Sequence, residues 1–105
     1  MAQPIYKVWF SKYKESWYKL TTDEKNKLLA QVEEAFKQVG GEEIVTCVSM
    51  WSSEKWLGWG VEKFPDIDAV QKHSEKLFSL NWFEYIDSVS SLGVEIQRTL
   101  IADFK

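Results

Sequence analysis

The stretch from Glu43 to Asp66 reads EIVTCVSMWSSEKWLGWGVEKFPD and decides the fold. Its first part, Glu43 to Trp51, carries apolar residues on both faces of an extended chain, which is typical of a strand covered on both sides. The Ser-Ser-Glu triplet that follows predicts a tight turn, so Lys55 to Phe64 returns as the second strand of a hairpin. Within that strand, Gly58 and Gly60 indicate a bulge or a place where another group approaches the backbone closely.

A helix is predicted on each side of this hairpin. Before it, Thr21-x-x-Glu24 forms a capping box, in which the threonine hydroxyl accepts from one amide and the glutamate reaches back to the other. The Gly40-Gly41 pair ends this first helix, because glycine adopts the left-handed conformation without steric cost. After the hairpin, Asp66 is the expected N-cap of the second helix. The apolar stripe of that helix is expected to comprise Ile67, Val70, Ser74, Leu77 and Phe78.

Two further strands complete the order β-α-β-β-α-β. Ile5 to Lys12 is rich in β-branched and aromatic residues and is predicted to be the first strand. After the second helix, Asn81 to Val89 is expected to add a helical turn or two, and Val94 to Ile101 to form the last strand. This order is typical of the α+β ferredoxin-like fold, a four-stranded antiparallel sheet with both helices on one face.

Composition places the chain among ordinary globular proteins. Its 105 residues fit one domain spanning residues 1–105, with 45% hydrophobic and 28% charged residues. No apolar run approaches the roughly 20 residues needed to span a bilayer, and the start Met1-Ala2-Gln3-Pro4 lacks the pattern of an export signal. The single cysteine, Cys47, cannot form an internal disulfide, which fits a cytoplasmic protein. A net charge of -3 disfavours nucleic acid and membrane surfaces as partners.

The six tryptophans bear on how the sheet is covered. With both helices on one face, the other face is bare and has to carry several of the aromatic residues, which leaves a large exposed apolar patch. We therefore expect a homodimer in which two open faces pack into a barrel-like shell, with a cavity inside or beside the interface. The alternative is a monomer whose C-terminal aromatic residues fold over the sheet.

Three segments carry a resemblance to a known family. The stretches Lys63-Phe64-Pro65-Asp66 and Asn81-Trp82-Phe83-Glu84-Tyr85 through Leu92-Gly93 resemble the dimeric α/β-barrel superfamily, and within it a small bacterial and archaeal family of unknown function. The segment from Trp9 to Glu24 is similar to the same family. The chain departs from that family in a longer loop between Trp9 and Trp17 and a shorter hairpin at Ser52-Ser53. The superfamily includes cofactor-independent monooxygenases, haem-degrading oxygenases, isomerases, polyketide cyclases and ligand-sensing proteins, so the fold does not fix the function.

Four residues are candidates for catalysis. His73 lies at the border of an apolar stripe, and its near-neutral pKa suits a base or an axial haem ligand. Tyr6 and Tyr85 could donate to a developing oxyanion, and Arg98 could clamp a carboxylate. The alternatives are a partly exposed histidine satisfied by water, Glu62 or Glu84, and an arginine that forms an interface salt bridge or snorkels.

Cofactor and metal binding are not expected. In haem-degrading relatives the ligand histidine lies further along the chain, and the matching stretch Trp82-Phe83-Glu84-Tyr85 has none. One histidine and one cysteine without spaced carboxylates do not make a metal site. Cys47 has no basic neighbour and is expected to be an inert thiol.

Three hypotheses for the function remain open. The first is a homodimer that binds a small apolar or aromatic ligand in a tryptophan-lined pocket formed by Trp9, Trp51, Trp56, Trp59 and Trp82. The second is a cofactor-independent monooxygenase, isomerase or cyclase that acts on a small aromatic or polyketide-like substrate. The third is a purely structural dimer with no pocket. They differ in whether a cavity exists and in which residues line it.

Overall fold

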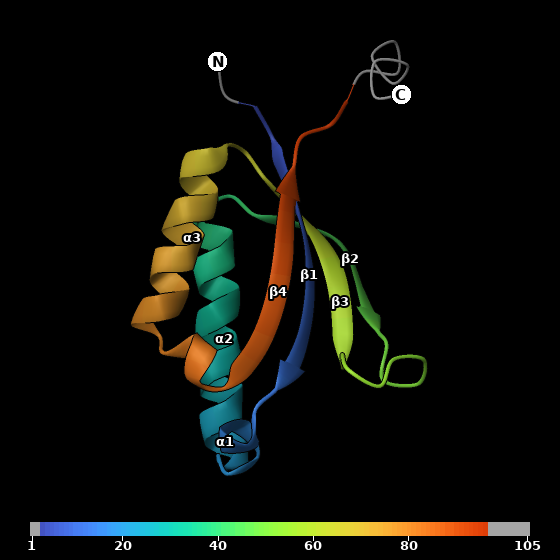
Figure 1. Ribbon diagram of the computed structural model, residues 1–105. Helices are drawn as coiled ribbons and strands as arrows, with labels where there is room; N and C mark the ends of the chain where they lie inside the picture. Colours follow the sequence, from blue (N-terminus) through green and yellow to red (C-terminus); the bar gives the residue numbers. More distant parts are fainter. Residues whose placement is uncertain (1–2, 97–105) are drawn as a thin grey trace.

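The computed structural model describes residues 3–96 and shows the predicted ferredoxin-like fold (Figure 1). The elements in chain order are β1 (Ile5–Tyr13), α1 (Glu15–Tyr18), α2 (Thr22–Gln38), β2 (Glu42–Val48), β3 (Gly58–Phe64), α3 (Ile67–Ser79), the 3-10 turn η1 (Trp82–Glu84) and β4 (Ile86–Gly93). The four strands form one antiparallel sheet in the order β2-β3-β1-β4. Helices α2 and α3 lie on the same face of this sheet, and its other face is open (Figure 1). None of the helices within residues 3–96 is both long and apolar enough to cross a bilayer.

The predicted helix signals are confirmed. The Thr21 hydroxyl accepts from the Glu24 amide at 3.1 Å, and the Glu24 carboxylate accepts from the Thr21 amide at 2.9 Å, which completes the capping box of α2. Gly40 follows the helix with a φ of 79°, the left-handed conformation that glycine adopts most easily. The Asp66 carboxylate accepts from the Ala69 amide at 2.8 Å and caps α3.

The prediction for the last strand is wrong. Strand β4 begins at Ile86 and ends at Gly93, where we expected helical turns and a break, and residues 94–96 form no strand. The remainder of the expected strand, residues 97–101, lies outside the described residues. The cause is long-range pairing: the backbone of β4 runs beside β1 from Tyr13↔Ile86 to Tyr6↔Gly93, and this pairing overrides the weak local preference of a serine-rich segment.

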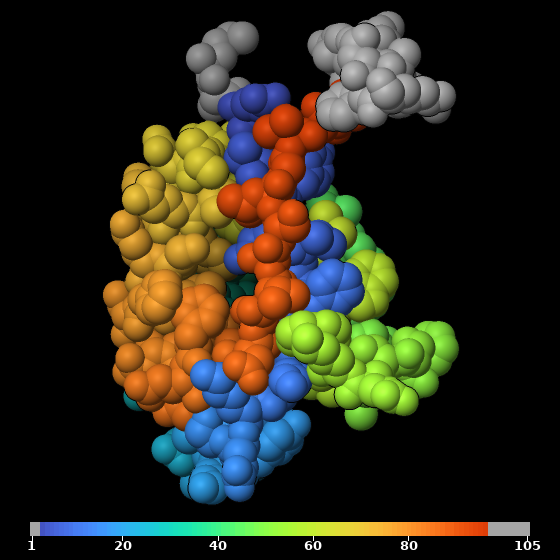
Figure 2. Space-filling model, in the orientation of Figure 1, coloured from blue at the N-terminus to red at the C-terminus, as the bar shows by residue number. Residues whose placement is uncertain are grey.

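The connection between β2 and β3 also differs from the prediction. A loop over residues 49–57 replaces the three-residue turn, because Ser49 leaves the sheet and its carbonyl accepts from the amides of Ser52 and Ser53 at 2.9 and 2.8 Å. The loop projects beyond the body of the molecule on the side away from the helices (Figure 2), and Trp51 within it is 83% exposed. Strand β2 is an edge strand and largely exposed, so the prediction that it is covered on both sides is wrong as well.

The packed core lies near the end of β3. Phe64 is fully buried against Ala69 and Val70 of α3. The rings of Phe64 and Phe36, the latter from α2, pack edge to face with their centroids 5.6 Å apart. The buried face of α3 comprises Ala69, Val70, His73 and Leu77, whereas Ile67 and Phe78 are exposed. The predicted apolar stripe is therefore wrong in part. His73 lies on the buried face of α3, and Ile67 and Phe78 do not.

Candidate functional site

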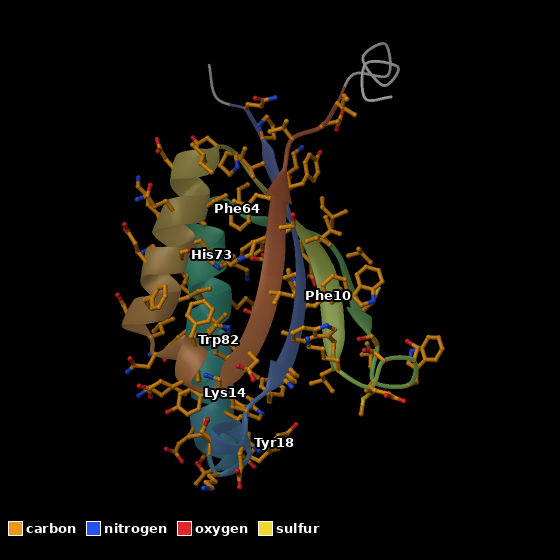
Figure 3. The ribbon with its side chains drawn as sticks, viewed as in Figure 1. Phe10, Lys14, Tyr18, Phe64, His73 and Trp82 are labelled. Carbon is orange, nitrogen blue, oxygen red and sulfur yellow. The ribbon has the colours of Figure 1, made fainter. Side chains whose placement is uncertain are left out.

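A cavity of about 300 Å³ lies between the sheet and the two long helices. Its floor is the helix-facing side of the sheet, its roof is formed by α2 and α3, and η1 closes one end. The apolar part of its lining includes Trp9, Phe36, Leu77, Trp82, Phe83 and Ile86. His73 and Trp82, from two different elements, both lie between helices and sheet (Figure 3). The volume is at the lower end of the range for small-molecule sites, about 300–1,000 Å³.

Trp9 forms the centre of the cavity floor. Its indole lies across Gly60 of the neighbouring strand, and a Cβ at Gly60 would be 2.7 Å from Cζ2 of the indole. Gly60 therefore fulfils the prediction of a close approach to the backbone, and the approaching group is Trp9. The indole Nε1 is buried and has no hydrogen-bond partner among the described residues.

His73 lies in the roof, between the rings of Phe36 and Phe64. The ring centroids are 5.5 and 5.3 Å from the imidazole, and His73 is only 4% exposed. Burial, and to a lesser extent the charge of Lys7, lowers the pKa of His73 from 6.5 to about 4, so the imidazole is neutral at pH 7. Its Nδ1 is buried without a hydrogen-bond partner in residues 3–96. The expectation of a partly exposed histidine satisfied by water is wrong on the degree of exposure.

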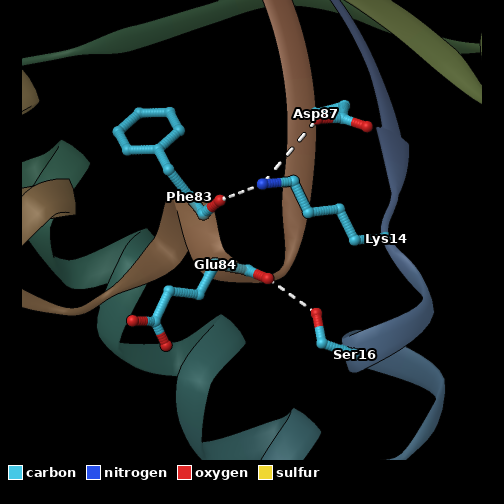
Figure 4. Close-up of polar contacts among 5 residues, drawn as sticks. All are labelled: Lys14, Ser16, Phe83, Glu84 and Asp87. Carbon is cyan, nitrogen blue, oxygen red and sulfur yellow. Dashed lines mark hydrogen bonds and ion pairs between the residues drawn. The ribbon is translucent and has the colours of Figure 1, made fainter.

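A set of polar contacts holds η1 in place at the end of the cavity (Figure 4). Lys14 Nζ donates to the Phe83 carbonyl at 2.8 Å and lies 3.8 Å from an oxygen of Asp87. Ser16 Oγ donates to the Glu84 carbonyl at 2.6 Å. These contacts tie the end of β1 to the turn that carries Trp82, so the wall of the cavity does not depend on local propensity alone.

Three charged residues cross the floor in one row. Glu43, Glu62 and Lys7 are register partners on β2, β3 and β1, and all three line the cavity. The pKa of Glu62 is raised, mainly by burial. The positive charge of Lys7 lowers this pKa in part, and the negative charge of Glu43 raises it further. This row was not predicted, although the sequence contains one signal for it. Ile5, Lys7 and Trp9 are two residues apart in β1, so Lys7 shares the inward face of the other two.

The remaining predicted site residues do not line this cavity. Tyr6 faces the open side and donates to Glu95 at 3.3 Å, and Tyr85 lines a separate hollow beside Leu20. Phe10 points away from the helices (Figure 3). Trp56 and Trp59 pack against it, and the ring centroid of each lies 6.4 Å from that of Phe10. Trp51 stands in the exposed loop. Arg98 lies outside the described residues. Of the nine candidates, the structure thus brings together Trp9, Trp82 and His73.

The fold and this site define an α+β protein of the ferredoxin-like class, with a cavity between sheet and helices. Solved structures with this fold include chlorite dismutase from Candidatus Nitrospira defluvii in complex with imidazole, with a TM-score of 0.75 and 12% identity over 99% of this chain and 44% of that chain. A proposed chlorite dismutase, TA0507, has a TM-score of 0.74 and 17% identity over 99% of this chain and 50% of that chain. The chain spans about half the length of these proteins, and the likeness concerns the fold. No family model and no curated protein matches the sequence.

Proposed function

We propose that the protein binds a small aromatic or apolar ligand in the cavity between the sheet and the helices. The observation that carries this proposal is the coincidence of an aromatic-walled cavity with two buried nitrogen atoms, Trp9 Nε1 and His73 Nδ1, that lack partners within residues 3–96. A buried polar group without a partner costs about 1–3 kcal/mol, and both atoms belong to residues that line the cavity. A ligand that hydrogen-bonds to them would remove this cost.

Binding is favoured over catalysis by the position of the candidate catalytic residues. Of the three candidates within residues 3–96, His73 lies on the cavity, while Tyr6 and Tyr85 lie elsewhere. The phenol donors that the enzyme hypothesis assigned to Tyr6 and Tyr85 are therefore not beside the imidazole. A purely structural role is disfavoured by the cavity itself, since that hypothesis expects the interior to be filled.

Haem does not fit the residues of this cavity. A volume of about 300 Å³ suits a ligand of one or two rings and is small for a tetrapyrrole. A histidine that binds a metal usually donates its other ring N–H to a carbonyl or carboxylate, and His73 Nδ1 has no such acceptor among the described residues. The proposal therefore includes no haem chemistry.

A titration with small aromatic compounds tests the proposal. Isothermal calorimetry should detect binding to the native protein. For compounds that carry a hydrogen-bond acceptor, Trp9→Phe should weaken binding about fivefold, because the floor stays aromatic but loses its N–H donor. Trp51→Phe is the matched control, since that indole is 83% exposed and lies outside the cavity. Absence of binding across a broad panel would refute the proposal, and a visible absorption band in the purified protein would instead restore the haem hypothesis.

We also propose that two copies pack through their open sheet faces. Apolar side chains occupy the middle of this face, among them Val8, Phe10, Trp59, Val61 and Val89. The structures that share the fold are about twice as long as this chain, which leaves room in each for a second unit of this size. Both observations support a second copy as the occupant of the face.

The oligomeric state tests this second proposal. Light scattering after size-exclusion chromatography should give the mass of a dimer for the native protein and that of a monomer for Val89→Asp. Ile67→Asp is the matched control, because Ile67 is equally exposed but lies on α3, away from the open face. A native monomer, or dissociation by both variants, would contradict the proposed interface.

A further inference from the structure

The charged row on the cavity floor holds more acidic than basic groups. Glu43 and Glu62 are directly opposite each other on β2 and β3, and Lys7 is opposite Glu62 on β1. Like charges placed opposite each other on neighbouring strands destabilise a sheet. One lysine balances one of the two carboxylates, and the neutral His73 adds no positive charge. The row therefore holds two carboxyl groups and one amine, and burial together with the charge of Glu43 raises the pKa of Glu62.

The carboxylate of Glu62 is available to a ligand. Glu43 accepts a hydrogen bond from the Thr46 hydroxyl, whereas Glu62 has neither a hydrogen-bond donor nor an ion-pair partner within 4.0 Å among residues 3–96. Both glutamates line the same cavity as His73. His73, more than nine-tenths buried and without a partner at Nδ1, is a separate sign that this lining is completed by a bound group.

The chemistry of the lining matches an ammonium group on an aromatic body. An alkylammonium has three N–H donors and no acceptor, so its nitrogen suits the carboxylates of Glu43 and Glu62 and the neutral imidazole of His73 rather than the Trp9 N–H. The third carboxylate on the lining, Glu33, already lies 3.2 Å from Lys37. The indoles of Trp9 and Trp82 and the ring of Phe36 provide faces that attract a cation as well as apolar surface for a ring. A carboxylate ligand would instead find two like charges on the floor beside the single Lys7.

We propose that the ligand of this cavity is a small arylalkylamine, whose protonated nitrogen binds to the carboxylates of Glu62 and Glu43. This inference rests on the proposed ligand-binding function and adds the charge class of the ligand to it. Hydrogen bonds with an ionised partner are about twice as strong as neutral ones, so the positive charge should account for a large share of the affinity.

Three compounds with the same ring and chain length test the charge class. At pH 7, calorimetric titration should show that 2-phenylethylamine binds about tenfold more tightly than 2-phenylethanol, and that phenylacetate binds most weakly. Failure of all three to bind would refute the cavity as a ligand site, and this inference with it. Binding of the alcohol or the acid as tightly as the amine would leave the cavity proposal intact and overturn the inference alone.

Variants then locate the charge. Glu62→Gln keeps the shape of the side chain and should reduce the preference for the amine over the alcohol from about tenfold to about twofold or less, with the affinity for the alcohol unchanged. Glu75→Gln is the control, because Glu75 is an exposed carboxylate on α3 that does not line the cavity. If both Glu62→Gln and Glu43→Gln kept the native preference for the amine over the alcohol, the assignment of the ammonium to these two carboxylates would be overturned. The comparison of the three compounds uses the native protein, so it still tests the charge class if a variant fails to fold.

Discussion

Acidification should destabilise this protein through its one histidine. His73 is buried between two phenylalanine rings, and a proton on its imidazole would place a charge in an apolar setting. In the unfolded chain the same imidazole titrates near 6.5. The perturbation is therefore a decrease in pH from 7 to 4.5, and the affected quantity is the free energy of unfolding.

The size of the effect follows from the two pKa values. The folded-state pKa of about 4 is depressed below the unfolded value of 6.5, so the stability from His73 is present above pH 6.5 and is lost as the pH falls towards 4. At about 1.4 kcal/mol per pKa unit the full difference corresponds to about 3 kcal/mol, of which about 2 kcal/mol is lost by pH 4.5. Glu62 acts in the opposite direction, because burial raises its pKa and its contribution to stability increases on acidification.

Urea unfolding of native protein and His73→Phe at pH 7 and pH 4.5 measures this contribution. The phenyl ring has a similar size but cannot be protonated, so the native protein should lose about 2 kcal/mol more than the variant, with Glu62 and all other groups in common. Proton NMR gives a direct check, since the chain contains a single histidine and its imidazole signals need no assignment. A midpoint between pH 6 and 7 for the His73 imidazole in the folded protein would show that burial does not lower its pKa, and would refute the predicted loss of stability.

Three further predictions concern the supports of the cavity. Gly60→Ala should destabilise the protein by about 2 kcal/mol in urea unfolding, because a Cβ there would lie 2.7 Å from the indole of Trp9 and from a backbone oxygen. Gly93→Ala, whose Cβ would meet nothing within 4 Å, should change stability little, and equal losses in both variants would contradict the packing argument. Thr21→Ala should cost about 1 kcal/mol by removing the cap of α2, and an unchanged urea midpoint would mean that the cap adds nothing. Lys14→Met should cost about 1 kcal/mol and speed amide hydrogen exchange in residues 82–85, and unchanged exchange there would show that η1 is held by other contacts.

The local signals in the sequence predicted the local structure. The capping box at Thr21, the N-cap at Asp66 and the glycine after α2 depend on atoms a few residues apart, so short windows of sequence contain them in full. Strand β4 does not have this property. Its serine-rich segment becomes a strand because it pairs with β1 at the other end of the chain, and no local pattern records that pairing.

The same distinction between local signals and long-range pairing explains which residues of the candidate site could be predicted. Trp9, Trp82 and His73 were found as residues whose chemistry is conspicuous in any context. Lys7 was missed, and Glu62 was considered only as a partner of His73, because charged residues in strands usually face solvent. Their register shows that both share the inner face with Trp9. The tryptophans of the open face were assigned to a pocket, although their rings pack against Phe10 on the opposite side of the sheet.

The strand order has a consequence for how the protein folds as it is synthesised. Strand β1 is made first, but its two neighbours in the sheet are β3 and β4, and β4 is the last described element to leave the ribosome. The β2–β3 hairpin can close early, since its two strands are neighbours along the chain, whereas β1 keeps one unpaired edge until residues 86–93 have emerged. Pairings between such distant segments slow folding and lengthen the exposure of the unpaired edge. The nascent chain therefore passes through a stage in which its first strand is half-paired, and a chaperone or a neighbouring nascent chain has most access to that edge then.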